Sequence, residues 1–422
     1  MSRPPLARTA IVTLALFGLL GLEAKEAMAQ DKNLKVWFGR ENFVPDDQFK
    51  TFMAENPDIN VDFEVVRLED VAAQLILAMR SNTAPDVVQI HAATVPQLAN
   101  GGVLHDATEL VEQMKKDAPE TYDQLAPITW AAATHDGNIY GASLHNQGIY
   151  LTYRTDWLDE AGVALPLETT DQVLEAAKAM AALGDDRYGF SLIGCCHSPV
   201  WEMPLFRSMG GQYVDGVPQL DSEPGHAWID FYQTLIREGG AHPDTLSWDS
   251  GEMRSAFIGG RAGAMNEGEH IYVPLHEQIP YEEGKWGFSA LPKLEGHEDA
   301  SVQSGFGFPY VITTASENPD AAMRAIEYLA RADTIKSVAI DYQPSSNMAV
   351  SEDPEYLAAK PWAPDILPLS SQLDPLPSHP TAQIQLYEIL KELREDMIAN
   401  ADEDPAAMAA RYQERLNEAA GG

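Results

Sequence analysis

The sequence has little cysteine and little positive charge. Its 422 residues include two cysteines, and 28 lysines and arginines stand against 64 aspartates and glutamates, for a formal net charge of -36. This charge argues against nucleic acid or an anionic membrane surface as a partner, because both are polyanions. The acidic residues form no long run, so we expect them on folded surfaces, where they favour solubility.

The two cysteines are neighbours, Cys195 and Cys196. Two interpretations remain open for them. In an oxidising compartment they can form a vicinal disulfide, which closes a small strained ring and adds little stability. Alternatively, they remain thiols and pack in the interior like small apolar residues.

Apolar runs long enough to cross a membrane are also missing. Arg3 and Arg8 form a basic region before an apolar stretch at residues 10–22, and this stretch is too short to span a bilayer comfortably. Ala27-Met28-Ala29 has the A-x-A pattern of a cleavage site, so residues 1–29 are predicted to be a signal peptide removed near Ala29. No cysteine stands directly after the apolar stretch at the cleavage site, which argues against a lipid anchor. We therefore expect an exported protein that is soluble in the periplasm and not embedded in the membrane.

Motifs for catalysis or cofactor binding are absent from the sequence. It contains no G-x-S-x-G, H-E-x-x-H, Walker A or C-x-x-C pattern. Carboxylates are so numerous that two will lie close together by chance, and none sits in a recognisable glycosidase motif. His135, Asp136 and His270 lack partners at the spacing of metal ligands. We predict no enzyme, no catalytic residue, no metal site and no cofactor.

What the sequence does contain is an alternation of strand and helix patterns. Short apolar strands are expected at residues 34–39, 59–66 and 86–90, with helical spacing at 46–55, 69–81 and 95–100. This order is typical of an α/β fold with a mainly parallel sheet, in which ligands bind at the carboxyl ends of strands. The pattern restarts at the capping box Thr169-x-x-Gln172 and continues with a strand at 188–193. Two helices, 382–399 and 405–419, are expected at the end.

Residues 140–154 combine two β-prone, apolar ends with a polar middle, His145-Asn146-Gln147-Gly148. Such a segment suits a crossing from one lobe to another beneath a cleft, with a return expected near residues 285–290. No low-complexity linker is present, so strands are expected to join the lobes. Residues 304–307, Ser-Gly-Phe-Gly, are expected to form a loop that leads into a strand at residues 305–313. The proline-rich residues 361–380 are expected to form an ordered loop or a segment that wraps around a lobe.

Several short pieces, in this order, are similar to one known family. They are Ala84-Pro85-Asp86-Val87-Val88-Gln89, Leu98-x-x-Gly101-Gly102, Tyr153-Arg154-x-x-x-Leu158-x-x-Ala161-Gly162, Gly260-Arg261-Ala262-Gly263-Ala264-Met265-x-x-Gly268, Leu291-Pro292 and Asn318-Pro319. Together they span nearly the whole mature chain. The chain resembles the extracellular solute-binding proteins of carbohydrate ABC transporters, family 1, the group that includes maltose-binding protein.

The resemblance implies an α/β, two-lobed periplasmic binding protein fold of type II, with hinge-linked lobes and a central ligand cleft. Lobe one would hold residues 30–144 plus 286–343, and lobe two residues 145–285 plus 344–422. The implied function is capture of a sugar or sugar-like solute and its delivery to the permease subunits of an ABC importer, by a monomer without a cofactor. Alternatives are a non-sugar or anionic solute (a polyol, a glycerophosphoryl or a sulfonated sugar derivative) and, least favoured, a secreted glycoside-active enzyme.

Sugar sites combine aromatic faces with planar hydrogen-bonding groups, and such residues occur at the expected strand ends and on the crossing. The candidates for ligand binding are Arg40, Glu41, Asn42, His91, His145, Asn146, Gln147, Cys195, Cys196, Trp201, Glu267, His270, Ser304, Gly305, Phe306 and, by the resemblance, Gln343. Each also has a structural interpretation: Arg40 as a surface charge, Trp201 as a core aromatic. Where many relatives have a tryptophan, this chain has Glu269-His270, which argues against a maltose-like oligosaccharide. Arg40 and the histidines keep an anionic sugar derivative open.

Overall fold

The computed structural model describes residues 32–40, 48–342 and 344–421. The predicted signal peptide, Glu41, Asn42 and Gln343 lie outside the described residues. Within the described part of the chain, no helix has both the length and the apolar character needed to cross a membrane.

The first lobe is built on a sheet that we call the large sheet. It contains β1 (Lys32–Phe38), β2 (Ile59–Val65), β3 (Val87–Gln89), β6 (Gly141–Gly148), β12 (Ser304–Ile312) and β13 (Asp374–Pro375). β1 runs parallel to both β2 and β3, as expected from the strand–helix alternation. β12 pairs antiparallel with β3 and with β6, so segments from the middle and the late part of the chain complete this sheet.

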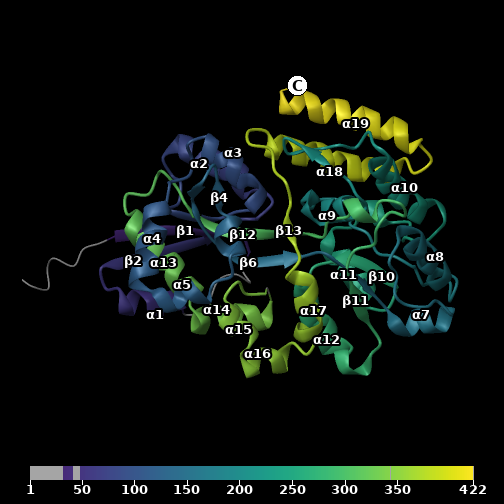
Figure 1. Cartoon of the computed structure of the whole chain (residues 1–422), viewed down its shortest axis with the longest axis horizontal. Coiled ribbons are helices and arrows are strands. Elements are labelled where there is room, and N and C mark those ends of the chain that lie inside the picture. Colours follow the sequence, from purple (N-terminus) through teal and green to yellow (C-terminus); the bar gives the residue numbers. More distant parts are fainter. Residues whose placement is uncertain (1–31, 41–47, 343, 422) are drawn as a thin grey trace, which may run out of the picture.

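Helices surround the large sheet in the left half of Figure 1. They are α1 (Gln48–Glu55), α2 (Val71–Ser81), α3 (Val95–Asn100), α4 (Thr108–Asp117), α5 (Pro119–Gln124), α6 (Ile128–Ala131), α13 (Pro319–Ala330), α14 (Ala332–Asp341), α15 (Met348–Ser351) and α16 (Pro354–Ala359). A small hairpin, β4 (Thr134–His135) with β5 (Asn138–Ile139), lies beside them. α13 buries Ala322, Ala325, Ile326 and Leu329, which recur every three or four residues and form the face that packs on the sheet.

The second lobe is built on a sheet that we call the small sheet. Its central strand β7 (Tyr150–Tyr153) pairs antiparallel with β10 (Ala264–Glu267) on one side and β11 (Gly287–Ser289) on the other. The associated helices are α7 (Thr155–Ala161), α8 (Thr170–Ala181), α9 (Met203–Ser208), α10 (Glu223–Arg237), α11 (Ser250–Ile258), α12 (Tyr272–Gln278), α18 (Gln383–Ala399) and α19 (Pro405–Ala420). The hairpin β8 (Tyr213–Val214) with β9 (Val217–Pro218) also belongs here, and α17 (Ala363–Ser370) lies between the two halves in Figure 1.

Residues 140–154 cross between the lobes as predicted. β6 belongs to the large sheet and β7 to the small sheet, and only Ile149 separates them. β12 runs beside the crossing, with Gly307 opposite Asn146. A Cβ atom at Gly307 would lie 2.2 Å from Oδ1 of Asn146, so only glycine lets the two strands approach this closely. The predicted capping box at Thr169 and Gln172 is also present, at the start of α8.

Two predicted loops contain regular structure. Residues 304–307 are the start of β12, not a loop, and their glycines serve the close packing against β6. The proline-rich stretch 361–380 includes α17, in which Pro364 occupies the first turn, where its missing N–H is not needed, and Pro368 lies inside the helix.

One predicted strand and the predicted return also differ from the structure. Residues 188–193 make isolated bridges, such as Ser191 with Met265, and do not form a continuous strand. The segment near residues 285–290, expected as the return between the lobes, contains β11, which pairs with β7 of the small sheet. The chain therefore re-enters the large sheet at β12, later than the expected lobe boundary at residue 286.

Candidate ligand-binding site

The first lobe places three side chains beyond the carboxyl ends of its parallel strands. Arg40 follows β1, Glu69 follows β2 and His91 follows β3. Arg40 Nη2 donates to Glu69 Oε1 at 3.0 Å, and its Nη1 donates to the hydroxyl of Tyr342 at 3.4 Å. This is the edge of the sheet at which α/β folds bind ligands.

The second lobe contributes a buried carboxylate, Glu267, at the end of β10. Three donors hold it: Trp201 Nε1 at 2.5 Å, Arg254 Nε at 2.7 Å and the backbone N–H of Gly268 at 2.8 Å. Trp201 ends the short helix η3 (Pro199–Trp201), and Arg254 lies on α11. Both predicted residues, Trp201 and Glu267, thus lie in one hydrogen-bonded group.

Side chains from the two lobes meet. His197 Nδ1 lies 3.7 Å from Glu69 Oε1, and His270 Nδ1 lies 3.1 Å from Gln147 Oε1 on the crossing strand β6. The ring of His270 also contacts that of Tyr342. We use the name interlobe cluster for the residues joined in this way and their neighbours at the strand ends: Arg40, Glu69, Gln89, His91, Gln147, His197, Ser198, Trp201, Arg254, Glu267 and His270.

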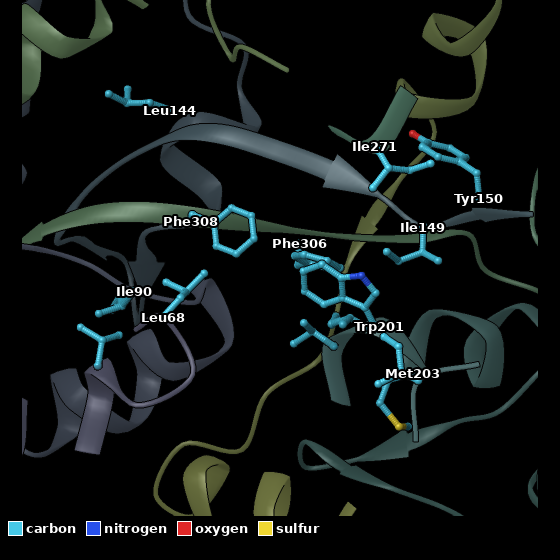
Figure 2. Close-up of a cluster of buried hydrophobic side chains, with 14 of the residues drawn as sticks. Leu68, Ile90, Leu144, Ile149, Tyr150, Trp201, Met203, Ile271, Phe306 and Phe308 are labelled. Carbon is cyan, nitrogen blue, oxygen red and sulfur yellow. The ribbon is translucent and has the colours of Figure 1, made fainter. Parts of the chain in front are cut away.

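An aromatic wall borders the interlobe cluster. The ring centroids of Trp201 and Phe306 are 5.0 Å apart, those of Phe306 and Phe308 5.6 Å, and those of Phe308 and His91 5.2 Å. Figure 2 shows Trp201 beside Phe306, with Phe308 further along β12. The wall therefore reaches from the second lobe to the first and offers apolar faces next to polar groups.

Burial keeps the histidines of the cluster neutral. Desolvation lowers the pKa of His91 to about 4, and the Arg40 charge adds to the effect. The pKa values of His197 and His270 lie well below the ordinary value, first because of burial and then because Arg254 and Arg40 are close. The two arginines pair with two glutamates, so the cluster has no formal net charge at neutral pH.

Several buried polar atoms of the cluster have no hydrogen-bond partner among the described residues. They are Gln89 Nε2, both ring nitrogens of His91, Gln147 Nε2, His197 Nε2, Ser198 Oγ, Arg254 Nη2 and His270 Nε2. Buried polar groups are nearly always hydrogen-bonded, so a concentration of unpaired ones marks a place for a ligand or for water.

Other predicted residues lie in the crossing instead of the interlobe cluster. Asn146 bonds to Ser143 and Ser346 on either side, and Ser304 Oγ accepts from Arg207 at 2.7 Å. Gly305 pairs with Gly148 of β6. His145 is buried on β6, where desolvation lowers its pKa to about 3, and it bridges to Ser345. The packing of the crossing accounts for these side chains.

The cysteines form the vicinal disulfide, Cys195–Cys196, one of the two interpretations left open above. Cys196 is exposed and has a φ of 63°, in the left-handed region. The pair directly precedes His197, so it lies at the border of the interlobe cluster. Within the described residues, no group of three or more His, Cys, Asp or Glu is arranged to hold a metal ion.

Sequence reasoning missed five members of the interlobe cluster: Glu69, Gln89, His197, its neighbour Ser198, and Arg254. Glu69 and His197 each lie a few residues beyond an expected strand, so a wider window at the strand ends would have included them. Gln89 lies inside a strand and Arg254 on a helix, and no sequence signal marks either as part of a site.

The family follows from comparison with known proteins. Residues 40–336 match the family described as bacterial extracellular solute-binding protein. The chain belongs to this family. A putative binding protein of Brucella abortus is 24% identical over 288 residues, 67% of each chain. The lactose-binding protein of Rhizobium radiobacter is 23% identical over 303 residues, 68% of each chain.

Among solved structures, a solute-binding protein of an ABC transporter from Agrobacterium radiobacter K84, in complex with ribitol, superposes with a TM-score of 0.77. It is 19% identical, and the match covers 92% of this chain and 98% of that one. The likeness confirms the predicted two-lobed α/β fold, and the family match over residues 40–336 confirms the resemblance.

Proposed function

We propose that the protein is a periplasmic binding protein, which captures a sugar or polyol between its lobes and passes it to the permease subunits of an ABC importer. The main support is the interlobe cluster, in which both lobes contribute buried polar atoms that have no partner in the described part of the chain, next to the aromatic wall. The aromatic faces suit the C–H side of a sugar or polyol, and the polar atoms suit its oxygens. The lactose-binding relative and the ribitol-bound neighbour support this substrate class.

The rest of the proposal follows the sequence. Residues 1–29 act as an export signal cleaved near Ala29, and the mature chain works as a monomer without catalysis. Glu69 and Glu267 each accept a hydrogen bond from an arginine, so neither is arranged as the proton donor that a glycosidase needs. The proposed lobes follow the sheets: the second begins at β7 and includes β11, and the first resumes at β12.

A thermal-shift screen of the purified mature protein tests the function. The panel holds neutral sugars, polyols and their anionic derivatives, with amino acids and polyamines for comparison. A ligand at 100 times its Kd stabilises the folded state by about 2.7 kcal/mol, which is easily seen as a rise in Tm. The proposal predicts a rise with at least one sugar or polyol compound. A rise with amino acids or polyamines alone would overturn it.

A further inference from the structure

The interlobe cluster has spare hydrogen-bond donors, while its carboxylate oxygens are in use. Three of the unpaired groups, Gln89 Nε2, Gln147 Nε2 and Arg254 Nη2, can only donate. By contrast, Glu267 accepts three hydrogen bonds, and Glu69 accepts one from Arg40. A ligand in this place therefore meets N–H groups that need acceptors.

The orientation of these donors is set by their other contacts. The backbone N–H of Gly39 donates to Oε1 of Gln89 at 2.9 Å, so the amide nitrogen is the end of Gln89 that is left over. Arg254 donates from Nε to Glu267, so its Nη2 is the buried donor that remains for a ligand. Gln89 is completely buried and Gln147 is 2% exposed, so bulk water does not form hydrogen bonds with their amide groups.

The histidines can add to the donor side when they are protonated. His91 has two unpaired ring nitrogens, and His197 and His270 each have an unpaired Nε2. A neutral imidazole carries one N–H and one acceptor nitrogen, and a protonated one carries two N–H groups and no acceptor. Next to a negative ligand the protonated form is favoured, so these three rings adapt to an anion. The hydroxyl of Ser198 can donate as well.

Two unpaired acceptors nearby have another explanation. Glu202 Oε2 and Asn266 Oδ1 belong to residues that line a cavity of about 20 Å³, together with Trp201, Phe190 and Tyr232. A cavity of this size holds about one water molecule, and a water can donate to both oxygens. They are therefore not needed for a solute.

We infer that the captured solute carries an oxyanion, a carboxylate, phosphate or sulfonate, on a polyhydroxylated skeleton, and that the spare N–H groups of the interlobe cluster bind this oxyanion. The inference rests on the proposed function and narrows its substrate class. A neutral sugar brings a donor as well as an acceptor with every hydroxyl, whereas Gln89 Nε2, Gln147 Nε2 and Arg254 Nη2 need acceptors only. An oxyanion brings several acceptors and no donor, and it supplies the negative charge that the histidines can balance.

Binding measurements on matched ligands test the inference. Isothermal titration calorimetry of the mature protein compares D-galactose with D-galacturonate and D-galactose 6-phosphate, D-mannitol with mannitol 1-phosphate, and glycerol with glycerol 3-phosphate; inorganic phosphate and sulfate form a separate arm. We expect an anionic member to bind about tenfold or more tighter than its neutral counterpart, since hydrogen bonds to charged groups are the stronger ones.

The outcomes separate the two proposals. If the neutral members bind as tightly as the anionic ones, the inference is overturned and the proposed function stands. If inorganic phosphate binds as tightly as the sugar and polyol phosphates, the polyhydroxylated skeleton is wrong, and the proposed function fails with it. If no member of any pair binds while amino acids do, the proposed function is also wrong.

Variants locate the oxyanion. Gln89→Glu and Gln147→Glu keep the shape of the side chain but replace the donating nitrogen by an oxygen, so each should weaken anion binding tenfold or more and change neutral binding much less. Gln113→Glu adds the same charge at an exposed position on α4 and serves as the matched control. Glu69→Gln removes a negative charge from the cluster and should tighten anion binding, a gain that misfolding does not produce. An unchanged ratio of anionic to neutral affinity in all three cluster variants would overturn the inference.

Discussion

His197 Nδ1 lies 3.7 Å from Glu69 Oε1, and this contact joins the two lobes. Glu69 stands between β2 and α2 of the first lobe, whereas His197 precedes η3 in the second. Glu69 Oε1 also accepts a hydrogen bond from Arg40. Separation of the lobes would break the contact and expose the neighbouring donors to water, so we expect the interlobe cluster to couple ligand binding to closure.

The first prediction is that the ligand-free protein opens in solution. A buried polar atom without a partner costs about 1–3 kcal/mol, and the interlobe cluster holds several. Opening lets water pair with these atoms, whereas a ligand pairs with them in the closed form. Small-angle X-ray scattering should give a larger radius of gyration without ligand than with a saturating one. Superimposable curves would contradict this explanation of the unpaired atoms.

The second prediction concerns Trp201→Phe. The change keeps an aromatic ring beside Phe306 but removes the N–H that donates to Glu267 Oε1. A lost hydrogen bond to a buried charged group lowers the unfolding free energy by about 1.5–3 kcal/mol. Urea denaturation measures the loss, and calorimetry should show weaker ligand binding. Trp130→Phe is the control, because Trp130 stacks on Tyr122 in the first lobe; equal losses in both variants would show that the Glu267 contact adds nothing.

The third prediction concerns Gly307→Ala. The new Cβ would lie 2.2 Å from Asn146 Oδ1 and 2.3 Å from Ser143 Oγ, so these two hydrogen-bonded side chains, or the strands β6 and β12, must shift where the lobes join. We expect a loss of about 1–3 kcal/mol, typical of overpacking. In Gly184→Ala the nearest atoms, which belong to the Arg187 side chain, are 3.9 Å from the new Cβ, so the Tm of this variant should stay close to that of the natural protein. A Gly307→Ala protein as stable as this control would refute the argument.

The crossing and the parallel half of the large sheet could be predicted from sequence because their patterns are local. β1 and β3 are short apolar runs, and the polar middle of β6 interrupts an apolar stretch. Residues 304–307 misled because two glycines are typical of a loop, whereas here they allow close contact between strands. α17 was missed because proline is unfavourable inside a helix in general, yet Pro368 lies within this one.

The interlobe cluster could be predicted only in part. Arg40, His91, Trp201, Glu267 and His270 come at or near strand ends, where the fold gathers ligand-binding residues. Glu69 could not be identified, because among 64 acidic residues no single glutamate stands out. Arg254 could not be identified either, because the sequence does not show toward which part of the fold an arginine on a helix points. Contacts such as His197 with Glu69 depend on how two lobes face each other, which no local pattern encodes.

The fourth prediction concerns acid stability. Burial lowers the pKa of His91 to about 4; Glu69 opposes this shift, and the charges of Arg40 and Lys391 add to it. Burial lowers the pKa of His145 to about 3; the Pro344 carbonyl opposes the shift, and the charge of Lys360 adds to it. Between these values and the ordinary 6.5, the unfolded chain binds protons that the folded protein does not, so stability is full above pH 6.5 and falls as the pH falls. At pH 5 each histidine should account for about 2 kcal/mol of lost stability.

Urea denaturation at pH 7 and pH 5 measures this loss. His91→Gln and His145→Gln should each reduce the difference between the two pH values by about 2 kcal/mol. His226→Gln, at a partly exposed position beside Asp221, is the matched control for the exchange itself, because this side chain is not buried. A loss of the same size in all three variants would place the acid sensitivity elsewhere.

The last prediction separates two effects of the Cys195–Cys196 bond. The bond closes no long loop, so its reduction should change the unfolding free energy by less than about 1 kcal/mol. However, the disulfide holds the Cys196 backbone at a φ of 63°, a conformation that costs a free cysteine about 1–2 kcal/mol. The next residue along the chain is His197, a member of the interlobe cluster. Reduction should therefore let this segment relax and weaken ligand binding severalfold with little change in Tm. The variant Cys195→Ser with Cys196→Gly keeps the left-handed backbone accessible and should retain more affinity than the double serine variant. Equal affinity of the oxidised, reduced and double serine forms would show that the bond does not position His197.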